Sequence, residues 1–566
     1  MFRSKYLDYA ELTQQLAAWA RDYPEFVSVS SLGATAEGRD IPLLTIGRNP
    51  DVARPAIWID GNMHASELCG SSVALAIAED VLNIHRDAKT ALSAPLPPHM
   101  AQALKESLFY IVPRMSPDGA EAVMKTGQYL RSSPADQRRH KGHAYWEAAD
   151  VDGDGRMGFM RQACADGELV ELAGAGVPGV MVPRMPEDPG PYYKLYPEGR
   201  IVNFDGRRIP DPYFLSDNQY DFNRNFPYQW APEHEQEGAG EYPGSAPETR
   251  AVLDFVTAHP HIFAWLNLHT FGGVLIRPLG DKADHKMDQG DLAVYRQVEA
   301  WAKEHTGYPT VSGFHEFLYT PETPIKGDLT DYAYHQRGCL AYVIELWDIF
   351  HQIGIETIKP FVDHYTRLDR KHFLALAKFD REVNQGRIFK AWRKVKHPQL
   401  GEVEVGGLDL LVGKSNPPFE MLGGVCATQS SAFLRVAALV PRVTLEVVKQ
   451  EKIGAEHTRI ELRIANVGYL ATHGLPSAKK LPHSEPLRLS AMGSGLKLLA
   501  PAEGLIEIGH LDGWGSGLYN GMSIFAPWTR GSIHERFVTL VVEGRGRLEV
   551  KVGSCRVGYR TIEIAV

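Results

Sequence analysis

Short apolar runs alternate with longer amphipathic segments over residues 1–380, and this alternation constrains the fold more than any other feature. Between the runs, apolar residues recur with the period of an α-helix, most clearly in SSVALAIAEDVLNIH at 71–85. Helices that follow strands in this way are typical of α/β folds, because each helix covers one face of a sheet. We therefore expect an α/β domain with a mixed β-sheet flanked by helices. Its clearest strands are predicted at 55–61, 107–113, 263–269 and 339–346.

The remaining regions differ in pattern. Residues 134–217 are rich in Pro, Gly and Asp and have few periodic segments, which predicts an insertion of the 1–380 domain that covers a functional surface. A basic stretch at 369–395 reads as helical, and residues 381–435 are predicted to be a linker region. Between 436 and 566, runs such as TRIELRIAN and GRLEVKVGS alternate with period two. This alternation predicts a small all-β sandwich domain at the C-terminal end.

Composition excludes several classes of protein. A hydrophobic content of 44% and a charged content of 23% indicate a globular chain rather than a disordered one. The net charge of -9, without a Lys/Arg-rich run, gives no reason to expect a nucleic-acid or membrane partner. The N-terminal residues have an amphipathic pattern rather than that of a signal peptide, so we expect a cytoplasmic protein unless a leading segment has been trimmed. Five widely spaced cysteines indicate free thiols. The oligomeric state is not readable from the sequence.

A histidine and a glutamate, His64 and Glu67, lie three positions apart directly after the apolar run at 55–61. The spacing alone is weak evidence, because His234 and Glu237 share it. That second pair lies in a charged segment with no strand before it, and we interpret it as part of a solvated loop. The position after a strand is therefore what distinguishes His64 and Glu67.

Two further polar residues lie where apolar strands end, namely His269 and Glu345. In open α/β sheets, reactive groups collect beyond the carboxyl ends of the strands, so both residues are candidates to meet His64 and Glu67 in one crevice. Two histidines and a glutamate form one of the ligand sets of catalytic zinc sites, which leaves a coordination position for water.

Six motifs follow one another along the chain: EGRDIPLLTIG (37–47), GNMHASE (61–67), PRMSPDGAE (113–121), YDFNRNFP (220–227), LNLHTFGG (266–273) and YVIELWD (342–348). In this order they resemble those of the zinc carboxypeptidase family, the M14 metallocarboxypeptidases, of a bacterial type with a C-terminal β-sandwich. The resemblance covers roughly residues 5–380 and implies a metalloprotease that binds one Zn²⁺ per chain. It implies that His64, Glu67 and His269 are the zinc ligands. It also implies that Glu345 is the general base that acts on a zinc-activated water.

The resemblance assigns further roles around this centre. Asn223 and Arg224 match the pair that binds the terminal carboxylate of the substrate. Arg131 matches the arginine that binds the substrate and stabilises the oxyanion of the reaction. Asp221 matches a carboxylate that orients a ligand histidine through its other ring nitrogen. Tyr319 is our choice for the catalytic tyrosine that covers the substrate, with a packed loop tyrosine as the alternative.

A second candidate metal site lies inside the 134–217 insertion. Asp150, Asp152 and Asp154 occupy alternate positions before Gly155, as in the first half of an EF-hand calcium loop. The twelfth position of such a loop is here Arg161, where calcium needs a bidentate glutamate. We therefore weigh a Ca²⁺ site against a solvated Asp/Gly turn.

The function that these features imply is hydrolysis of the C-terminal peptide bond of peptides or proteins that present a free C-terminal carboxylate. Two alternatives stay open. One is an amidase or peptidase that acts on peptidoglycan stem peptides, and the other is a catalytically inactive relative that only binds peptides. Side-chain preference would depend on the region around 328–331, where an acidic residue would favour a basic leaving residue.

Overall fold

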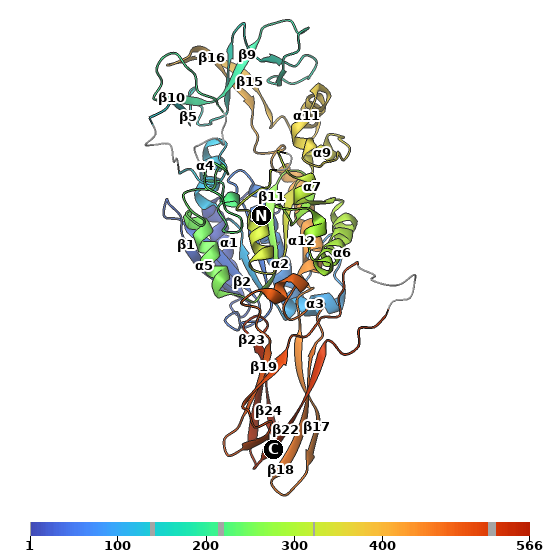
Figure 1. Ribbon diagram of the computed structural model, residues 1–566. Coiled ribbons are helices and arrows are strands. Elements are labelled where there is room, and N and C mark those ends of the chain that lie inside the picture. Colours follow the sequence, from blue (N-terminus) through green and yellow to red (C-terminus); the bar gives the residue numbers. More distant parts are fainter. Residues whose placement is uncertain (1, 136–141, 213–219, 321–322, 519–527) are drawn as a thin grey trace.

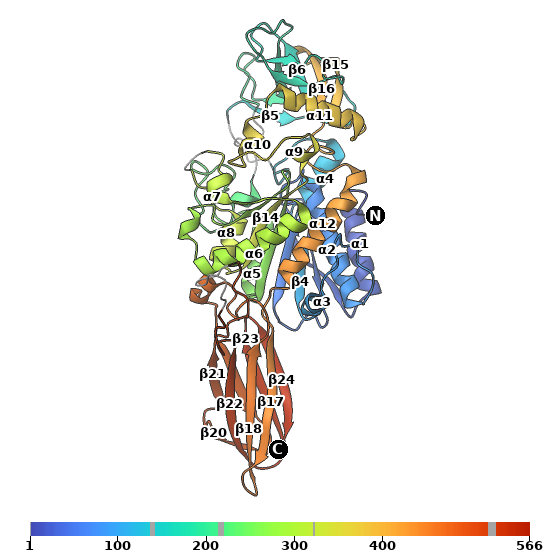
Figure 2. The same ribbon diagram turned by 90° about the vertical axis from the view of Figure 1, so that its right-hand side faces the viewer.

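A computed structural model describes residues 2–135, 142–212, 220–320, 323–518 and 528–566 (Figure 1). A central α/β domain carries a small β-rich domain at one end and a β-sandwich at the other, so the molecule is elongated (Figures 1 and 2). Among the described residues, we find no helix with both the length and the apolar character needed to span a membrane.

The central domain is built on an eight-stranded mixed sheet with the order β1-β2-β4-β3-β11-β14-β12-β13. The four middle strands, β4, β3, β11 and β14, run parallel to one another, and antiparallel strands extend the sheet on both sides. The expected α/β fold with a mixed sheet is thereby confirmed. The strands are β1 (Val27–Ala34), β2 (Asp40–Ile46), β3 (Ala56–Gly61), β4 (Leu108–Val112), β11 (Ile262–Thr270), β12 (Val274–Arg277), β13 (Thr310–Ser312) and β14 (Leu340–Leu346).

Helices cover both faces of this sheet. Alternate residues of β3 belong to different cores: Ile57 and Ile59 pack with α1, α2, α6 and α12, whereas Trp58 packs with α5 and α8. Strands buried on both faces are apolar throughout, which explains why the sequence shows continuous runs. The helices are α1 (Tyr9–Asp22), α2 (Leu68–His85), α3 (Pro98–Lys105), α4 (Pro117–Thr126), α5 (Pro247–Ala258), α6 (Gln289–Thr306), α7 (Gly313–Glu316), α8 (Leu329–His335), α9 (Ile349–Gln352), α10 (Asp363–Thr366), α11 (Arg370–Glu382) and α12 (Phe419–Ala437).

Part of the 134–217 insertion forms short strands rather than irregular loops, although 136–141 and 213–217 lie outside the described residues. The strands are only three to five residues long, too short to show a period in the sequence. Of these strands, β6 pairs with a hairpin from the region after α11, in a sheet of order β15-β16-β6-β9-β7-β8. Strands β5 and β10 form a separate pair. The strands are β5 (Tyr145–Ala148), β6 (Phe159–Ala163), β7 (Leu169–Glu171), β8 (Met181–Pro183), β9 (Tyr193–Pro197), β10 (Gly199–Val202), β15 (Phe389–His397) and β16 (Gly401–Leu408).

The region after α11 therefore differs from the helical stretch that the sequence predicts. Helix α11 ends at Glu382, and 389–397 are a strand whose exposed basic residues pair across to β16. Within 381–435, the hairpin belongs to the small β domain, whereas α12 packs on α2 of the central domain. A hairpin of this kind gains its stability from a sheet partner far away in the sequence, which local periodicity does not reveal.

The expected C-terminal β-sandwich is confirmed as two four-stranded antiparallel sheets. Alternate residues such as Ile460 and Leu462 of one sheet and Val550 of the other fill the space between them. Buried Arg556 docks the sandwich beneath the central sheet, because its guanidinium donates to the carbonyl oxygens of Pro260, Arg337 and Gly338, which precede β11 and β14. The strands are β17 (Val443–Lys452), β18 (His457–Asn466), β19 (Leu487–Met492), β20 (Lys497–Ala500), β21 (Leu505–Gly509), β22 (Glu535–Glu543), β23 (Arg547–Ser554) and β24 (Gly558–Ala565).

Candidate active site

The turn between β3 and α2 holds the first two candidate ligands. Asn62 adopts a left-handed conformation with φ of 56°, which asparagine tolerates better than most residues. Its side-chain amide donates to the carbonyl oxygens of His64, at 2.7 Å, and Ala65, at 3.1 Å. A Cβ atom on Gly61 would lie 2.6 Å from the backbone of Gly70, so only glycine allows the strand and the helix start to approach this closely. The turn therefore presents His64 at a fixed position.

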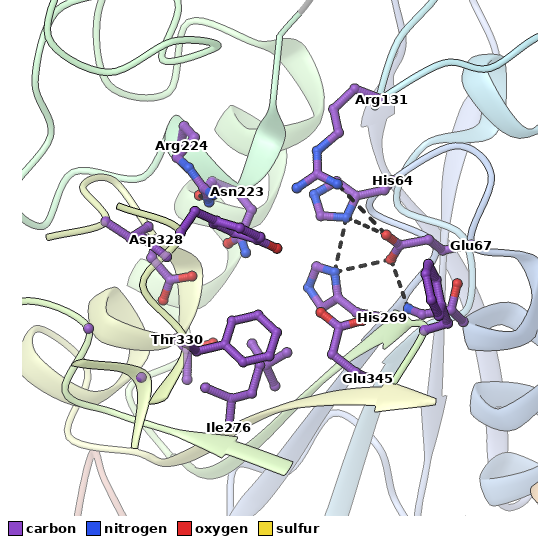
Figure 3. A pocket seen from close by; sticks show the side chains of 18 of the residues that line it. His64, Glu67, Arg131, Asn223, Arg224, His269, Ile276, Asp328, Thr330 and Glu345 are labelled. Atoms are coloured by element: carbon purple, nitrogen blue, oxygen red, sulfur yellow. Dashed lines mark hydrogen bonds and ion pairs between the residues drawn. The ribbon is translucent and has the colours of Figure 1, made fainter. Parts of the chain in front are cut away.

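Strand register brings the other two residues to the same place. In the parallel pair β11–β14, His269 lies directly opposite Glu345, at the carboxyl ends of both strands. Strand β3 is the other neighbour of β11, so its following turn lies beside His269. Figure 3 shows His64, Glu67, His269 and Glu345 facing one another.

The three candidate ligands form one buried cluster. His64 Nδ1 lies 2.8 Å from Glu67 Oε1, and His269 Nδ1 lies 3.0 Å from His64 Nδ1 and 3.1 Å from Glu67 Oε2. In a tetrahedral zinc site with Zn–N distances of about 2.0–2.1 Å, neighbouring donor atoms lie roughly 3.3 Å apart. Two imidazole nitrogens and a carboxylate that converge at nearly this spacing fit a zinc ion. The charges of the two histidines hold the pKa of Glu67 well below its ordinary value, although its burial acts in the opposite direction.

Asp221, which is predicted to orient a ligand histidine, lies beside the first histidine. Asp221 Oδ1 lies 3.1 Å from His64 Nε2, and its other oxygen accepts a hydrogen bond of 2.9 Å from Arg131 Nε. Although burial raises the pKa of Asp221, the charges of Arg131 and Arg224 outweigh it and hold that pKa well below the ordinary range. An ionised Asp221 keeps the proton of His64 on Nε2, which leaves Nδ1 free to bind a metal.

The second histidine is held by a chain of contacts that the sequence analysis missed. His269 Nε2 hydrogen-bonds to the Asn267 side-chain oxygen, and the Asn267 amide donates to Asp60. Asp60 also accepts hydrogen bonds from the indoles of Trp58, at 2.7 Å, and Trp265, at 2.8 Å. Burial raises the pKa of Asp60 to about 6, while these three donors act in the opposite direction. In the sequence, the signal for this group of contacts is a single charged residue, Asp60, inside the apolar run IWIDG.

The three candidate ligands and Glu345 line one pocket of about 210 Å³. Asn223 and Arg224 lie across the two histidines from Glu67, so the pocket extends away from the ligand cluster on that side (Figure 3). The Arg224 guanidinium donates to the Asn223 carbonyl oxygen at 2.8 Å, and no carboxylate of the described residues forms an ion pair with it. Its remaining donors are therefore available to an anion in the pocket.

Comparison with known families agrees with this geometry. The model of the family described as zinc carboxypeptidase matches residues 12–158 and 207–365, which is more than half of the chain. The chain belongs to the zinc carboxypeptidase family. A second model, described as a domain of unknown function, matches residues 442–565, the β-sandwich.

Individual relatives of this chain match it with low sequence identity or over a short segment. Carboxypeptidase B of Astacus astacus is 35% identical over 20% of this chain and 34% of its own length. Carboxypeptidase D of Mus musculus is 22% identical over 66% of this chain and 21% of its own length. The chain thus spans about a third or less of these curated relatives. A solved structure of bovine thrombin-activatable fibrinolysis inhibitor, bound to a tick carboxypeptidase inhibitor, is 18% identical with a TM-score of 0.39, over 68% of this chain and 100% of that one.

Glu345 borders the pocket beside His269. Burial and the negative charge of Glu67 raise the pKa of Glu345 well above its ordinary value, while Arg131 acts in the opposite direction. A carboxylate whose pKa is raised in this way is suited to accept and return a proton.

Tyr319 also lines the pocket, where the sequence analysis placed the tyrosine that covers the substrate. Its ring is 58% exposed, as expected for a side chain at the mouth of a pocket. Partial desolvation and the negative charge of Glu345 raise the pKa of Tyr319 to about 12. The phenol is therefore a proton donor for hydrogen bonds at neutral pH, and its role as a cover stays a prediction.

The far end of the pocket carries Asp328 and Thr330 (Figure 3). Asp328 caps α8 by accepting a hydrogen bond of 2.9 Å from the Asp331 backbone N–H. Asp331 accepts hydrogen bonds from the Gly280 backbone N–H, so it braces the pocket wall. Burial raises the pKa of Asp328.

The structure does not support the predicted calcium site. Asp152 and Asp154 both form ion pairs with the Arg393 guanidinium of β15. Asp150 instead accepts hydrogen bonds from the backbone N–H groups of Gly153, at 2.7 Å, and Gly155, at 2.8 Å. Asp150, Asp152 and buried Glu198 do present ligand atoms within 4.8 Å of one another. An arginine nevertheless neutralises Asp152 and Asp154, and Asp150 binds the backbone of an Asp/Gly turn.

Proposed function

We propose that this protein is a zinc-dependent carboxypeptidase that removes the C-terminal residue of a peptide. One observation supports it above all: the Arg224 guanidinium, which forms no ion pair with a described carboxylate, lies in the same pocket as the buried cluster of His64, Glu67 and His269. A peptide whose terminal carboxylate binds at Arg224 would present its last peptide bond to that cluster. Guanidinium binds carboxylate well through parallel hydrogen bonds.

The cluster supplies the site for the metal. Bound zinc would lower the pKa of a water molecule and polarise the scissile carbonyl group. Asp221 and Asn267 would keep the proton of each ligand histidine on Nε2, so that both Nδ1 atoms face the ion.

Glu345 and Arg131 would act on the reacting groups. Glu345 would take a proton from the attacking water and give it to the nitrogen of the leaving residue as the peptide bond breaks. Arg131, which Asp221 holds at the pocket wall, would donate to the oxygen that becomes negative at the scissile carbon.

Two alternatives are distinguished by substrate and by turnover. A peptidase or amidase that acts on peptidoglycan stem peptides could use Arg224 equally, since those substrates also present a carboxylate. An inactive peptide-binding relative is disfavoured, because the three candidate ligands and Glu345 are all present in one pocket.

The proposal is tested with a peptide acid and the same peptide amidated at its C-terminus. Loss of a charge-assisted contact in a desolvated site costs about 2 to 5 kcal/mol, so kcat/KM should be roughly 30-fold or more higher for the acid. Arg224→Ala should remove this preference by impairing hydrolysis of the acid.

Arg207→Ala is the matched control, because Arg207 is exposed in the small β domain. It should keep the native preference. Equal hydrolysis of acid and amide by the unmodified protein would refute the carboxypeptidase proposal.

A further inference from the structure

A loop outside the segments that match the family reaches the active-site pocket. It joins β16 to α12, and its residues Lys414 and Ser415 line the pocket together with Glu67. Sequence analysis assigned this loop to a linker and gave it no part in the site.

The loop is fixed firmly against the ligand turn. Asn416 is fully buried, and its side chain accepts a hydrogen bond from the Cys69 backbone N–H at 2.8 Å and donates one to the Ser66 carbonyl oxygen at 2.7 Å. On the other side of Lys414, the Trp347 indole donates to the Gly413 carbonyl oxygen at 3.0 Å. The backbone on both sides of Lys414 is therefore held in place beside the metal-ligand cluster.

Lys414 brings a positive charge into the pocket without a carboxylate partner among the described residues. Its Nζ atom lies 3.8 Å from the centre of the Phe271 ring and 3.5 Å from the Ser415 hydroxyl. Burial lowers the pKa of Lys414 to about 8, although Glu67 acts in the opposite direction, so the amine is mostly charged at neutral pH. A partly desolvated ammonium of this kind is stabilised when an anion binds beside it.

The position of Lys414 indicates which part of a substrate it meets. Phe271 follows Thr270, whose backbone N–H donates to Glu67 Oε2 at 3.1 Å, so Lys414 lies on the Glu67 side of the histidines. Arg224 lies on the opposite side (Figure 3). A peptide whose terminal carboxylate binds at Arg224 and whose last bond lies at the centre must therefore continue toward Lys414.

We propose that Lys414 binds a carboxylate on the residue that precedes the scissile bond, so that the preferred substrates carry an acidic residue at that position. This inference rests on the proposed carboxypeptidase function. It adds a substrate class that depends on a residue outside the family match.

The test compares two N-acetylated peptides that differ only in Glu or Gln before the same C-terminal residue. The measured quantity is the ratio of kcat/KM for the Glu peptide to that for the Gln peptide. The native ratio should be about 10 or more, as for a charge-assisted contact in a partly desolvated site. Lys414→Met, which keeps the length of the side chain, should lower the ratio to about 1, and Lys414→Arg should keep it well above 1.

Lys394→Met is the matched control, because Lys394 is exposed on β15 and its loss changes the net charge by the same amount. It should leave the ratio at the native value. A native ratio near 1, or an unchanged ratio in Lys414→Met, would overturn the assignment while leaving the carboxypeptidase proposal intact. Failure of the native protein to cleave either peptide would instead overturn the proposed function, and this inference with it.

Discussion

The candidate zinc site and the aspartate turn both contain residue types that bind cations, and they differ in how the chain arranges them. The first draws His64 and Glu67 from one turn and His269 from a strand about 200 residues later, and all three are buried. The second consists of Asp150, Asp152 and Asp154 from a single segment, in which Asp150 and Asp154 are exposed.

The neighbours of each cluster differ just as much. Asp221 and Asn267 hold the rings of the two histidines with their Nδ1 atoms inward. Arg393, in contrast, supplies the positive charge that Asp152 and Asp154 need. Residue types alone therefore do not make a metal site. Donors must converge and be oriented from behind.

The largest effect expected from this comparison concerns Glu345, which the proposed mechanism makes the general base beside the first cluster. Glu345→Gln should lower kcat on the order of 100-fold or more, because the proton relay is lost while the zinc ligands stay. Peptide hydrolysis and zinc content are measured together. Glu356→Gln, an exposed carboxylate in the segment after α9, is the control and should be unaffected. Near-normal turnover of Glu345→Gln would mean that another group is the base.

A smaller effect is expected for the residue that orients His269 from behind. Asn267→Ala removes the hydrogen bond to His269 Nε2 and one of the three donors to Asp60. Loss of such a partner weakens zinc binding by about 10- to 100-fold, which chelator competition measures as the zinc Kd. Asn466→Ala removes a buried amide of the sandwich and should leave the zinc Kd unchanged. If both variants bind zinc as the native protein does, orientation does not matter here.

The central sheet and the core of the site were predictable because their signals are local. Strands β3, β11 and β14 are apolar runs, and a candidate site residue lies at or near the carboxyl end of each. Parallel neighbours then bring His269 and Glu345 together whatever the loops do. The pair His234 and Glu237, with the same spacing as His64 and Glu67, lies exposed in its loop because no strand positions it.

Features that depend on distant partners were not predictable. Strand β15 reads locally as part of a basic helical stretch. It becomes a strand because it pairs with β16, which in turn pairs with β6, more than 200 residues earlier. Lys414 reaches the pocket because Asn416 binds Cys69 and Ser66, 347 and 350 positions away. The contact between Asn267 and Asp60 likewise spans 207 positions. The sequence shows these residues but not that they meet.

Metal content of the purified protein tests the central claim most directly. Plasma emission analysis should find one zinc and no calcium per chain, zinc absent from His269→Ala, and zinc retained at one per chain in Asp152→Ala. This pattern follows because the first cluster presents two histidine nitrogens beside a carboxylate, whereas Arg393 pairs with Asp152 and Asp154 of the second. Full zinc in His269→Ala, or zinc lost from Asp152→Ala, would contradict the account.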